Sequence, residues 1–287
     1  MGPQGRSLRV TSCPRGGRCA CDPRLHARSA SYNLCIMQIL NIAAYKFVTL
    51  DRLPELQAAV LDALQARSLK GTVLLAEEGI NLFLAGPPAM VHDFLAWLRL
   101  DPRLDDLGVK ESFSHAQPFR KLLVKIKPEI IRMNHPAIQP AAGRAPAVDA
   151  HTLKRWLDAG HDDTGRPVVM LDTRNDFEVD AGTFKNAIDW RIARFTQFPQ
   201  ALLDHRDTLG DKTVVSFCTG GIRCEKAAIF MREAGLHNVW QLDGGILKYF
   251  EVNGHAHFEG DCFVFDERRA LDPALQPKVN RPAPVQT

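Results

Sequence analysis

Residues 37–132 carry alternating strand and helix patterns that predict a first domain. Helical spacing of apolar residues marks two segments, LPELQAAVLDALQAR and PPAMVHDFLAWLRL. Short β-rich runs predict the strands ILNIAAYKFV, GTVLLA, INLFLA and LLVKIK, and VKESFSH is expected to pair with the last of them. The resulting order β-α-β-β-α-β is that of an α+β ferredoxin-like (acylphosphatase-like) domain, with two helices on one face of a sheet.

A second pattern begins after a proline-rich segment. Residues 133–147 include MNHPAIQPAAGRAP, which shows no periodicity and is interpreted as a linker. In residues 148–262 the apolar strands PVVMLDT, TVVSF and NVWQLDGG alternate with helical stretches, which predicts an α/β domain with a parallel sheet and helices on both faces. Residues 263–287 are expected to form a largely disordered tail, proline-rich from Asp272.

The stretch TVVSFCTGGIRCEKAAIFM carries the clearest candidate chemistry. Thr213 to Phe217 predict a strand, and the apolar spacing from Ala227 predicts a helix. The residues between them form a short glycine-containing loop at the carboxyl end of a strand: Cys218, Thr219, Gly220, Gly221, Ile222 and Arg223. Catalytic groups of parallel sheets gather at this end.

Backbone amides in such a loop, next to a helix N-terminus, form a cradle for an anion. Together with Arg223 they are expected to lower the pKa of Cys218 and to favour a reactive thiolate or persulfide. The alternative is that Cys218 is a small buried hydrophobe. Cys224, in the first turn of the helix, is equally compatible with a resolving thiol and with packing beside Ala227 and Met231.

Several motifs resemble one known family. LDTRNDFEVDAGTFKNAI, CTGGIRC and VWQLDGGILKYF resemble the signatures of rhodanese domains. KGTVLLAEEGIN, RNDFE, FCTGGIRCEKA and FVFDER, in this order, resemble the bacterial rhodanese-domain tRNA uridine(34) 5-hydroxylases, from about Met37 to Arg268.

The resemblance implies oxygen-dependent hydroxylation of the wobble uridine of tRNA, with Cys218 required, molecular oxygen as co-substrate and the tRNA anticodon region as partner. Asp172 and Arg174 match the first signature pair, for which a structural ion pair is favoured over direct catalysis. Thr183 stands where many rhodaneses carry His, and the cysteine-rich tail of many relatives is replaced by a proline-rich one.

Charge and composition add two constraints. Residues 1–36 hold six arginines and one aspartate and are interpreted as an extension, either disordered or due to a mis-assigned start, so the rest of the chain is nearly neutral despite a net charge of +3. RNA binding therefore needs a local patch. One candidate is the strand FRKLLVKIK, with Arg120, Lys121, Lys125 and Lys127, for which an ordinary solvated edge strand fits nearly as well. The other is Lys226 at the helix start, although a solvated helix face is the commoner position of such a charge.

No apolar run is long enough to span a bilayer, so the sequence is not expected to be that of a membrane protein. Four of the seven cysteines precede Met37, and the three others cannot form a disulfide framework, which favours the cytoplasm. The oligomeric state is left open.

Oxygen chemistry raises the question of a cofactor. His255, His257 and Glu259 alternate as one face of a strand would require for a two-His, one-carboxylate site, but a polar loop end explains them as well, and we expect no metal site. No G-x-G-x-x-G motif opens a helix after a strand, so no cofactor can be identified and the electron donor stays unknown.

Three functions remain to be compared. A tRNA hydroxylase accounts for both domains, a rhodanese-type sulfurtransferase carrying a Cys218 persulfide needs only the second, and an anion-binding module does not need a cysteine. The first is preferred.

Overall fold

The computed structural model describes residues 38–277. Residues 1–37, which include the expected N-terminal extension, and residues 278–287 lie outside the described residues. Residues 263–277, the first part of the tail that was expected to be disordered, are described and include a short strand, Ala270–Leu271. None of the helices within residues 38–277 is both long and apolar enough to cross a membrane.

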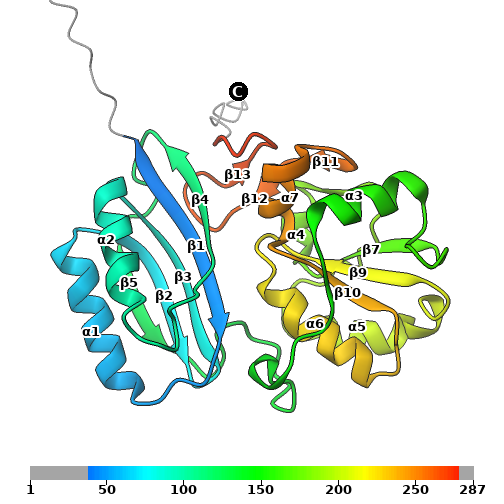
Figure 1. Cartoon of the computed structure of the whole chain (residues 1–287), viewed down its shortest axis with the longest axis horizontal. Helices are drawn as coiled ribbons and strands as arrows, with labels where there is room; N and C mark the ends of the chain where they lie inside the picture. The colour runs from blue at the N-terminus through cyan, green and yellow to red at the C-terminus, as the bar shows by residue number, and fades with distance from the viewer. Residues whose placement is uncertain (1–37, 278–287) are drawn as a thin grey trace, which may run out of the picture. The chain divides into compact units, whose positions relative to one another are not determined.

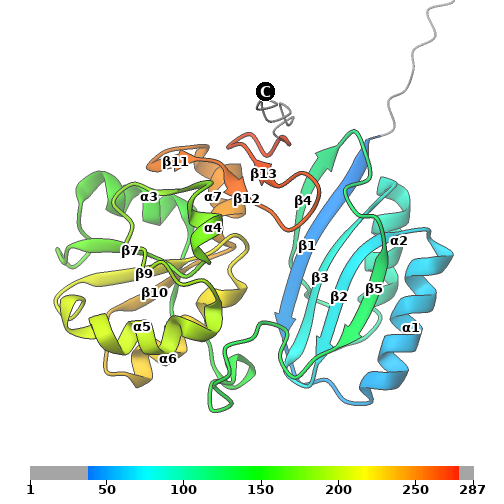
Figure 2. The ribbon, with the colours of Figure 1, turned by 180° about the vertical axis from the view of Figure 1, so that it is seen from behind.

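The first sheet has the ferredoxin-like order β4-β1-β3-β2, with one strand added at its edge. Its elements are β1 (Ile39–Phe47), α1 (Leu53–Ala66), β2 (Lys70–Ala76), β3 (Gly79–Gly86), α2 (Pro88–Leu98), β4 (Val109–Ser114) and β5 (Leu122–Ile126). The expected order of elements is confirmed, and α1 and α2 lie on the same face of the sheet (Figures 1 and 2).

The expected pairing of VKESFSH with LLVKIK is wrong. β4 pairs with β1, from Ile39 opposite Ser114 to Ala44 opposite Val109, while β5 runs parallel to β2. The reason is topological, because a right-handed crossover through α2 places β4 parallel to β3 on the far side of β1. β5 is therefore an extra edge strand.

The two faces of this sheet differ. Leu40 and Ile42 of β1 pack with Val60 of α1 and Phe94 of α2 in an apolar core. Because side chains alternate along a strand, the intervening positions face the side that the helices leave uncovered. Asn41 is one of these, and it is paired with Ser112 of β4.

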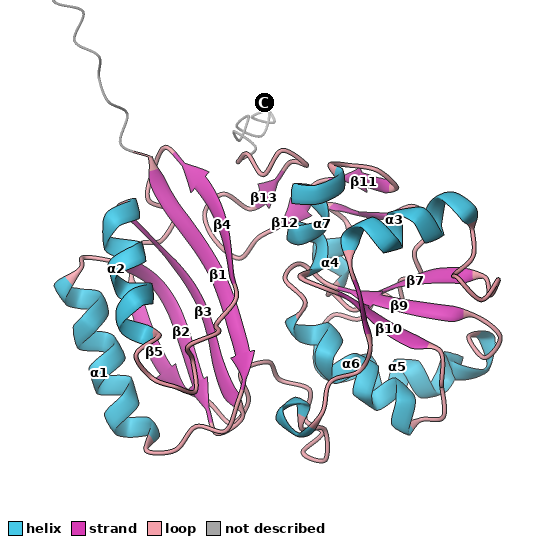
Figure 3. Ribbon diagram, viewed as in Figure 1, coloured by secondary structure: helices cyan, strands magenta, loops and turns pink. Residues whose placement is uncertain are grey.

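The second sheet is parallel, with strand order β6-β10-β9-β7, as expected (Figure 3). Its elements are β6 (Ala147–Val148), α3 (Ala150–Ala159), β7 (Val168–Asp172), α4 (Asp176–Val179), β8 (Gly182–Phe184), α5 (Phe198–His205), β9 (Thr213–Phe217), α6 (Ile222–Glu233), β10 (Val239–Leu242) and α7 (Gly245–Asn253). One apolar cluster packs α3 and α7 against the sheet, and another packs α5 and α6 against it. Helices thus cover both faces.

The segment between the sheets is packed rather than free. It contains the short 3₁₀ helix η1 (Pro140–Ala142), and Met133 and Ile138 are buried with residues of α5 and α6. Two further 3₁₀ turns, η2 (Phe195–Gln197) and η3 (Arg206–Thr208), flank α5.

The chain after α7 forms small antiparallel pairs. β11 (Phe258–Gly260) pairs with β8, and β12 (Cys262–Phe263) pairs with β13 (Ala270–Leu271). His255, His257 and Glu259 do not share one strand face, because β11 begins only at Phe258. His257, at a φ of 57°, instead makes a 2.7 Å contact with Asp158.

Candidate active site

The loop from Cys218 to Gly221 forms a cradle around the Cys218 sulfur. β9 is buried along its whole length and ends at Phe217, so Cys218 begins the loop at the carboxyl end of a central strand. Gly221 adopts a φ of 99° at the N-cap of α6, and its N–H donates to the Cys218 Sγ at 3.1 Å. The inward-facing amide predicted from the glycine pair is confirmed.

The Gly244-Gly245 pair holds the same loop from the other side. The N–H groups of Ile246 and Leu247 donate to the carbonyl oxygens of Cys218 and Thr219 at 3.0 and 3.1 Å. Gly245 has a φ of 68°, and a Cβ atom there would lie 2.5 Å from the Cys218 carbonyl oxygen. Only glycine satisfies both requirements.

The electrostatic surroundings favour a thiolate at Cys218. Burial alone would raise the pKa of Cys218, but a hydrogen bond from Cys224, the charge of Arg223 and the amides of Arg223 and Gly221 together lower it. Burial and the neighbouring Cys218 raise the pKa of Cys224. One member of the pair is thus a thiolate while the other remains a thiol.

Arg223 is fixed by a residue that the sequence analysis did not single out. Its terminal nitrogens donate to the two carboxylate oxygens of Glu178 at 2.6 and 2.7 Å, and both side chains are buried. The Arg223 Nε is buried without a hydrogen-bond partner among residues 38–277. Glu178 ends the RNDFE motif, so the motif itself was the available signal.

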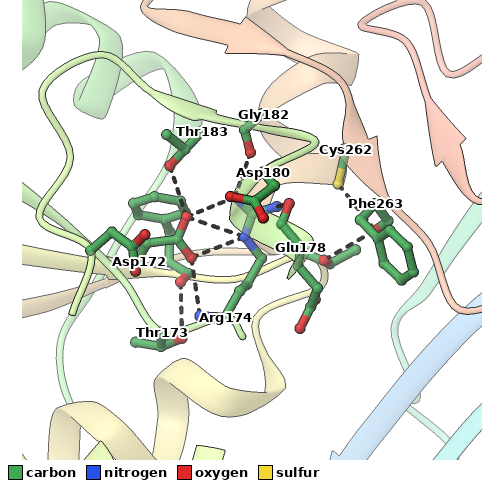
Figure 4. Close-up of polar contacts among 12 residues, drawn as sticks. Asp172, Thr173, Arg174, Glu178, Asp180, Gly182, Thr183, Cys262 and Phe263 are labelled. Carbon is green, nitrogen blue, oxygen red and sulfur yellow. Dashed lines mark hydrogen bonds and ion pairs between the residues drawn. The ribbon is translucent and has the colours of Figure 1, made fainter. Parts of the chain in front are cut away.

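Asp172 and Arg174 form a second buried ion pair (Figure 4), with both side chains at 0% exposure. Arg174 also donates to the Gly182 carbonyl at 2.6 Å, and the Thr183 hydroxyl donates to Asp172 at 2.8 Å. These contacts tie β7 to β8 and leave both charges paired. Thr183, where many rhodaneses carry His, thus completes this network.

A cavity of about 510 Å³ reaches the loop. Cys218, Thr219, Gly220, Ile222 and Arg223 line it, whereas Gly221 and Cys224 are not among its lining residues. The uncovered face of the first sheet contributes polar and aromatic residues to the lining, namely Asn41, Tyr45, Asn81, Phe83, Lys110 and Ser112. Sequence reasoning missed all six, since nothing local indicates that β1, β3 and β4 border the same cavity as Cys218.

Lys110 is a cation that lines this cavity and whose side chain forms no ion pair with another described residue. Its Nζ lies 5.3 Å from the centroid of the Tyr45 ring, and no hydrogen bond or ion pair joins it to another residue of the described chain. Burial lowers the pKa of Lys110, opposed by the negative charges around it, of which Cys218 is the strongest. The cavity therefore contains an ammonium group without a hydrogen-bond or ion-pair partner among the described residues, and the Cys218 charge is close enough to raise its pKa.

Lys226 occupies a different environment from the solvated helix face considered above. It is 1% exposed, and its Nζ donates to Glu78 at 3.0 Å, to Glu129 at 2.7 Å and to the Ile131 carbonyl at 3.0 Å. Glu225 is likewise buried. An ammonium group with three internal acceptors has no free donor for a phosphate, so this candidate for tRNA binding is withdrawn.

The other four basic candidates are exposed. Lys121, Lys125 and Lys127 lie in and beside the edge strand β5, and Arg120 pairs with Glu267. None of them lines the cavity. They remain candidates for contacts to a substrate larger than the cavity.

The comparisons with known proteins agree with this arrangement. Residues 39–130 match the UPF0176 acylphosphatase-like domain, and residues 149–251 match the rhodanese-like domain. No group of three or more His, Cys, Asp or Glu residues within the described chain is placed to hold a metal ion.

The chain matches similar proteins over nearly the whole length of those proteins. The tRNA uridine(34) hydroxylase of Bordetella petrii is 69% identical over 239 residues, which is 83% of this chain and 95% of that protein. That of Variovorax paradoxus is 68% identical over 240 residues (84% and 91%), and that of Bordetella pertussis is 65% identical over 240 residues (84% and 98%). The chain belongs to the tRNA uridine(34) hydroxylase family.

Proposed function

We propose that this protein hydroxylates the wobble uridine of tRNA at C5, with molecular oxygen as co-substrate and Cys218 as the reactive group. The observation that carries the proposal is that Cys218, favoured as a thiolate, lines a cavity together with Lys110 and aromatic side chains. The names of the relatives support tRNA uridine as the substrate.

The cavity suits a single unstacked base. Its volume of about 510 Å³ falls within the roughly 300–1,000 Å³ of small-molecule sites. Phe83, Phe119 and Phe195 line it and offer apolar surface to a pyrimidine, while Asn81 and Lys110 offer polar groups. Enzymes that act on a base in RNA commonly take it from the stack, and the anticodon loop presents such bases.

The chemistry at Cys218 follows from the electronic structure of uracil. A thiolate that adds to C6 moves negative charge to C5 and the O4 carbonyl oxygen, which makes C5 reactive towards oxygen. We assign the stabilisation of that charge to Lys110, one of the cations that line the cavity. Addition of C5 to oxygen gives a C5 hydroperoxide, whose O–O bond is cleaved by a two-electron thiol reductant to leave the C5 hydroxyl group and water. Loss of the C5 proton and of the Cys218 thiolate then restores the ring double bond.

The four exposed cations along β5 extend the site beyond the base. We infer that Arg120, Lys121, Lys125 and Lys127 contact the phosphates of the anticodon arm, because they present charge along a sheet edge. We place the activity in the cytoplasm, where tRNA is modified and where free thiols such as Cys218, Cys224 and Cys262 stay reduced.

The test is nucleoside mass spectrometry of tRNA from a strain that lacks this protein. Wild-type chain should restore 5-hydroxyuridine-derived nucleosides, and Cys218→Ser should not. Unchanged tRNA in the deletion strain, with thiosulfate:cyanide sulfur transfer by the purified chain, would instead establish the sulfurtransferase alternative.

A further inference from the structure

Cys224 is a buried thiol to which the proposed function assigns no part. It is 0% exposed, its N–H donates to the Gly221 carbonyl at 3.1 Å, and its Sγ lies 3.7 Å from the Thr173 hydroxyl. Ala227 and Met231 belong to the apolar cluster with α5, but Cys224 does not. Packing with that cluster therefore does not account for it.

The Cys224 side chain is buried beside the Cys218 loop. Gly221 contacts both cysteines, because its N–H donates to the Cys218 Sγ at 3.1 Å and its carbonyl oxygen accepts the Cys224 N–H at 3.1 Å, and both cysteines are 0% exposed. The Cys224 thiol is accordingly among the groups that lower the pKa of Cys218. The Sγ of Cys262, the third cysteine of the described chain, lies 3.7 Å from the Phe263 carbonyl oxygen (Figure 4), and Cys262 is not among the groups that most strongly shift the pKa of Cys218. Cys218 and Cys224 thus form a specific thiolate–thiol pair, one member of which reaches the cavity.

Hydroxylation by molecular oxygen requires electrons that the substrate does not supply. One oxygen atom enters the C5–H bond, and the other must be reduced to water by two electrons and two protons. Residues 38–277 contain no cluster of ligands for a metal ion. A dithiol that becomes a disulfide releases two electrons, which is the number required.

We propose that Cys218 and Cys224 are the immediate electron donor of the hydroxylation, so that each turnover leaves a Cys218–Cys224 disulfide. The inference rests on the proposed function. In the net step the C5–H and O–O bonds break, a C5–O bond and an S–S bond form, and one water leaves. Its two protons come from the Cys224 thiol and from solvent, because Cys218 enters as the thiolate. The Cys224 sulfur takes the second oxygen atom of the C5 hydroperoxide, and the Cys218 thiolate released from C6 then displaces that oxygen as water to form the S–S bond.

A disulfide at this position also explains how the enzyme is restored. Cys218 lines the cavity, whereas Cys224 is not among the lining residues. A thiol reductant that enters the vacated cavity meets the Cys218 sulfur first, and the Cys224 thiol is then the leaving group. Repeated turnover therefore requires a small thiol or an exposed protein dithiol, whereas the first turnover requires none.

The test is a single-turnover experiment with the full chain, in which Cys13, Cys19, Cys21 and Cys35 are replaced by serine to remove other thiols. The reduced protein is freed of reductant under nitrogen and mixed with undermodified tRNA in oxygenated buffer. Nucleoside mass spectrometry counts 5-hydroxyuridine, and peptide mass spectrometry counts the disulfide. We expect the two to appear together, at about one of each per chain.

Two variants sharpen the test. Cys224→Ser should make at least tenfold less product in the single turnover although it binds tRNA, and Cys262→Ala, the matched control, should behave as wild type. Product formed while both thiols stay reduced, or Cys224→Ser equal to wild type, would overturn the inference. The wild-type disulfide count tests it even where a variant fails to fold. Absence of product with excess dithiothreitol and oxygen would overturn the proposed function, and this inference with it.

Discussion

Arg223 and Glu178 form a bidentate ion pair, with N–O distances of 2.6 and 2.7 Å, at the start of the helix that follows the Cys218 loop. Glu178 also accepts the Asn175 N–H at 3.1 Å. The carboxylate therefore fixes the guanidinium whose charge lowers the pKa of Cys218. This pair joins the first signature motif to the loop.

Glu178→Ala should destabilise the fold, because it leaves the buried Arg223 charge without a partner. Removal of one member of a buried pair typically costs about 3–5 kcal/mol. Urea unfolding followed by circular dichroism measures this change. Glu233→Ala, which removes an exposed carboxylate at the end of α6, is the control and should change stability by about 0.5 kcal/mol or less. Equal effects of the two variants would contradict the role assigned to Glu178.

Gly245→Ala should be more damaging than Gly235→Ala. Both glycines have a positive φ, so both alanines carry a strain of roughly 1–2 kcal/mol. Only at Gly245 would the Cβ also meet backbone, 2.5 Å from the Cys218 carbonyl oxygen, whereas nothing lies within 4 Å at Gly235. The comparison isolates the close contact from the dihedral strain. We expect Gly245→Ala to lose hydroxylation activity and Gly235→Ala to keep it. Similar activities and melting temperatures of the two variants would contradict this expectation.

The pH dependence of the enzyme should report the Cys218 thiolate. Because the folded-state pKa of Cys218 is lowered, single-turnover activity should persist at neutral pH and fall only as the pH drops through that value. Thiolate absorbance near 240 nm, taken as the difference between wild type and Cys218→Ser, measures the same titration. A midpoint near the ordinary thiol value of about 8.5 would contradict the cradle argument.

The same shift has a consequence for stability. A group with a depressed pKa stabilises the fold most above its unfolded pKa, and this contribution is lost as the pH falls through the folded pKa. The difference in unfolding free energy between wild type and Cys218→Ser should therefore be largest at alkaline pH and decline towards acid. Denaturant titrations at several pH values measure it.

How far the sequence predicts this site depends on how local each feature is. The strand, loop and helix around Cys218 lie within a single stretch of chain, so turn chemistry and periodicity were sufficient there. The pairing of β4 with β1 was missed because apolar alternation marks a strand but does not name its neighbour. Lys226 looked solvated because its partners Glu78 and Glu129 lie 148 and 97 residues away in the sequence.

Lys110 shows the same limit at the site itself. In the sequence it is one charged residue on a short strand, and only the fold brings it to a cavity shared with Cys218. Lys110→Met should lower the hydroxylation rate by roughly 10²-fold, the effect of losing one donor to a developing oxyanion. Lys110→Arg should retain part of the rate, and Lys185→Met, which replaces an exposed lysine outside the cavity, should leave the rate unchanged. A change in tRNA affinity alone, with an unchanged rate at saturation, would contradict a role in charge stabilisation.

The exposed cations along β5 should act on tRNA affinity and not on the chemical step. Replacing Lys121, Lys125 and Lys127 together by alanine removes three positive charges from a strand edge that lies outside the cavity. If each lysine neutralises one phosphate, the slope of log K against log salt should fall by about 0.7–0.9 for each lysine replaced. Lys154→Ala, on α3, is the control and should leave the slope unchanged. Filter binding over a range of salt concentrations measures the slope. Single-turnover rates at saturating tRNA should equal wild type, and a slower chemical step in the triple variant would show that β5 acts on the site itself.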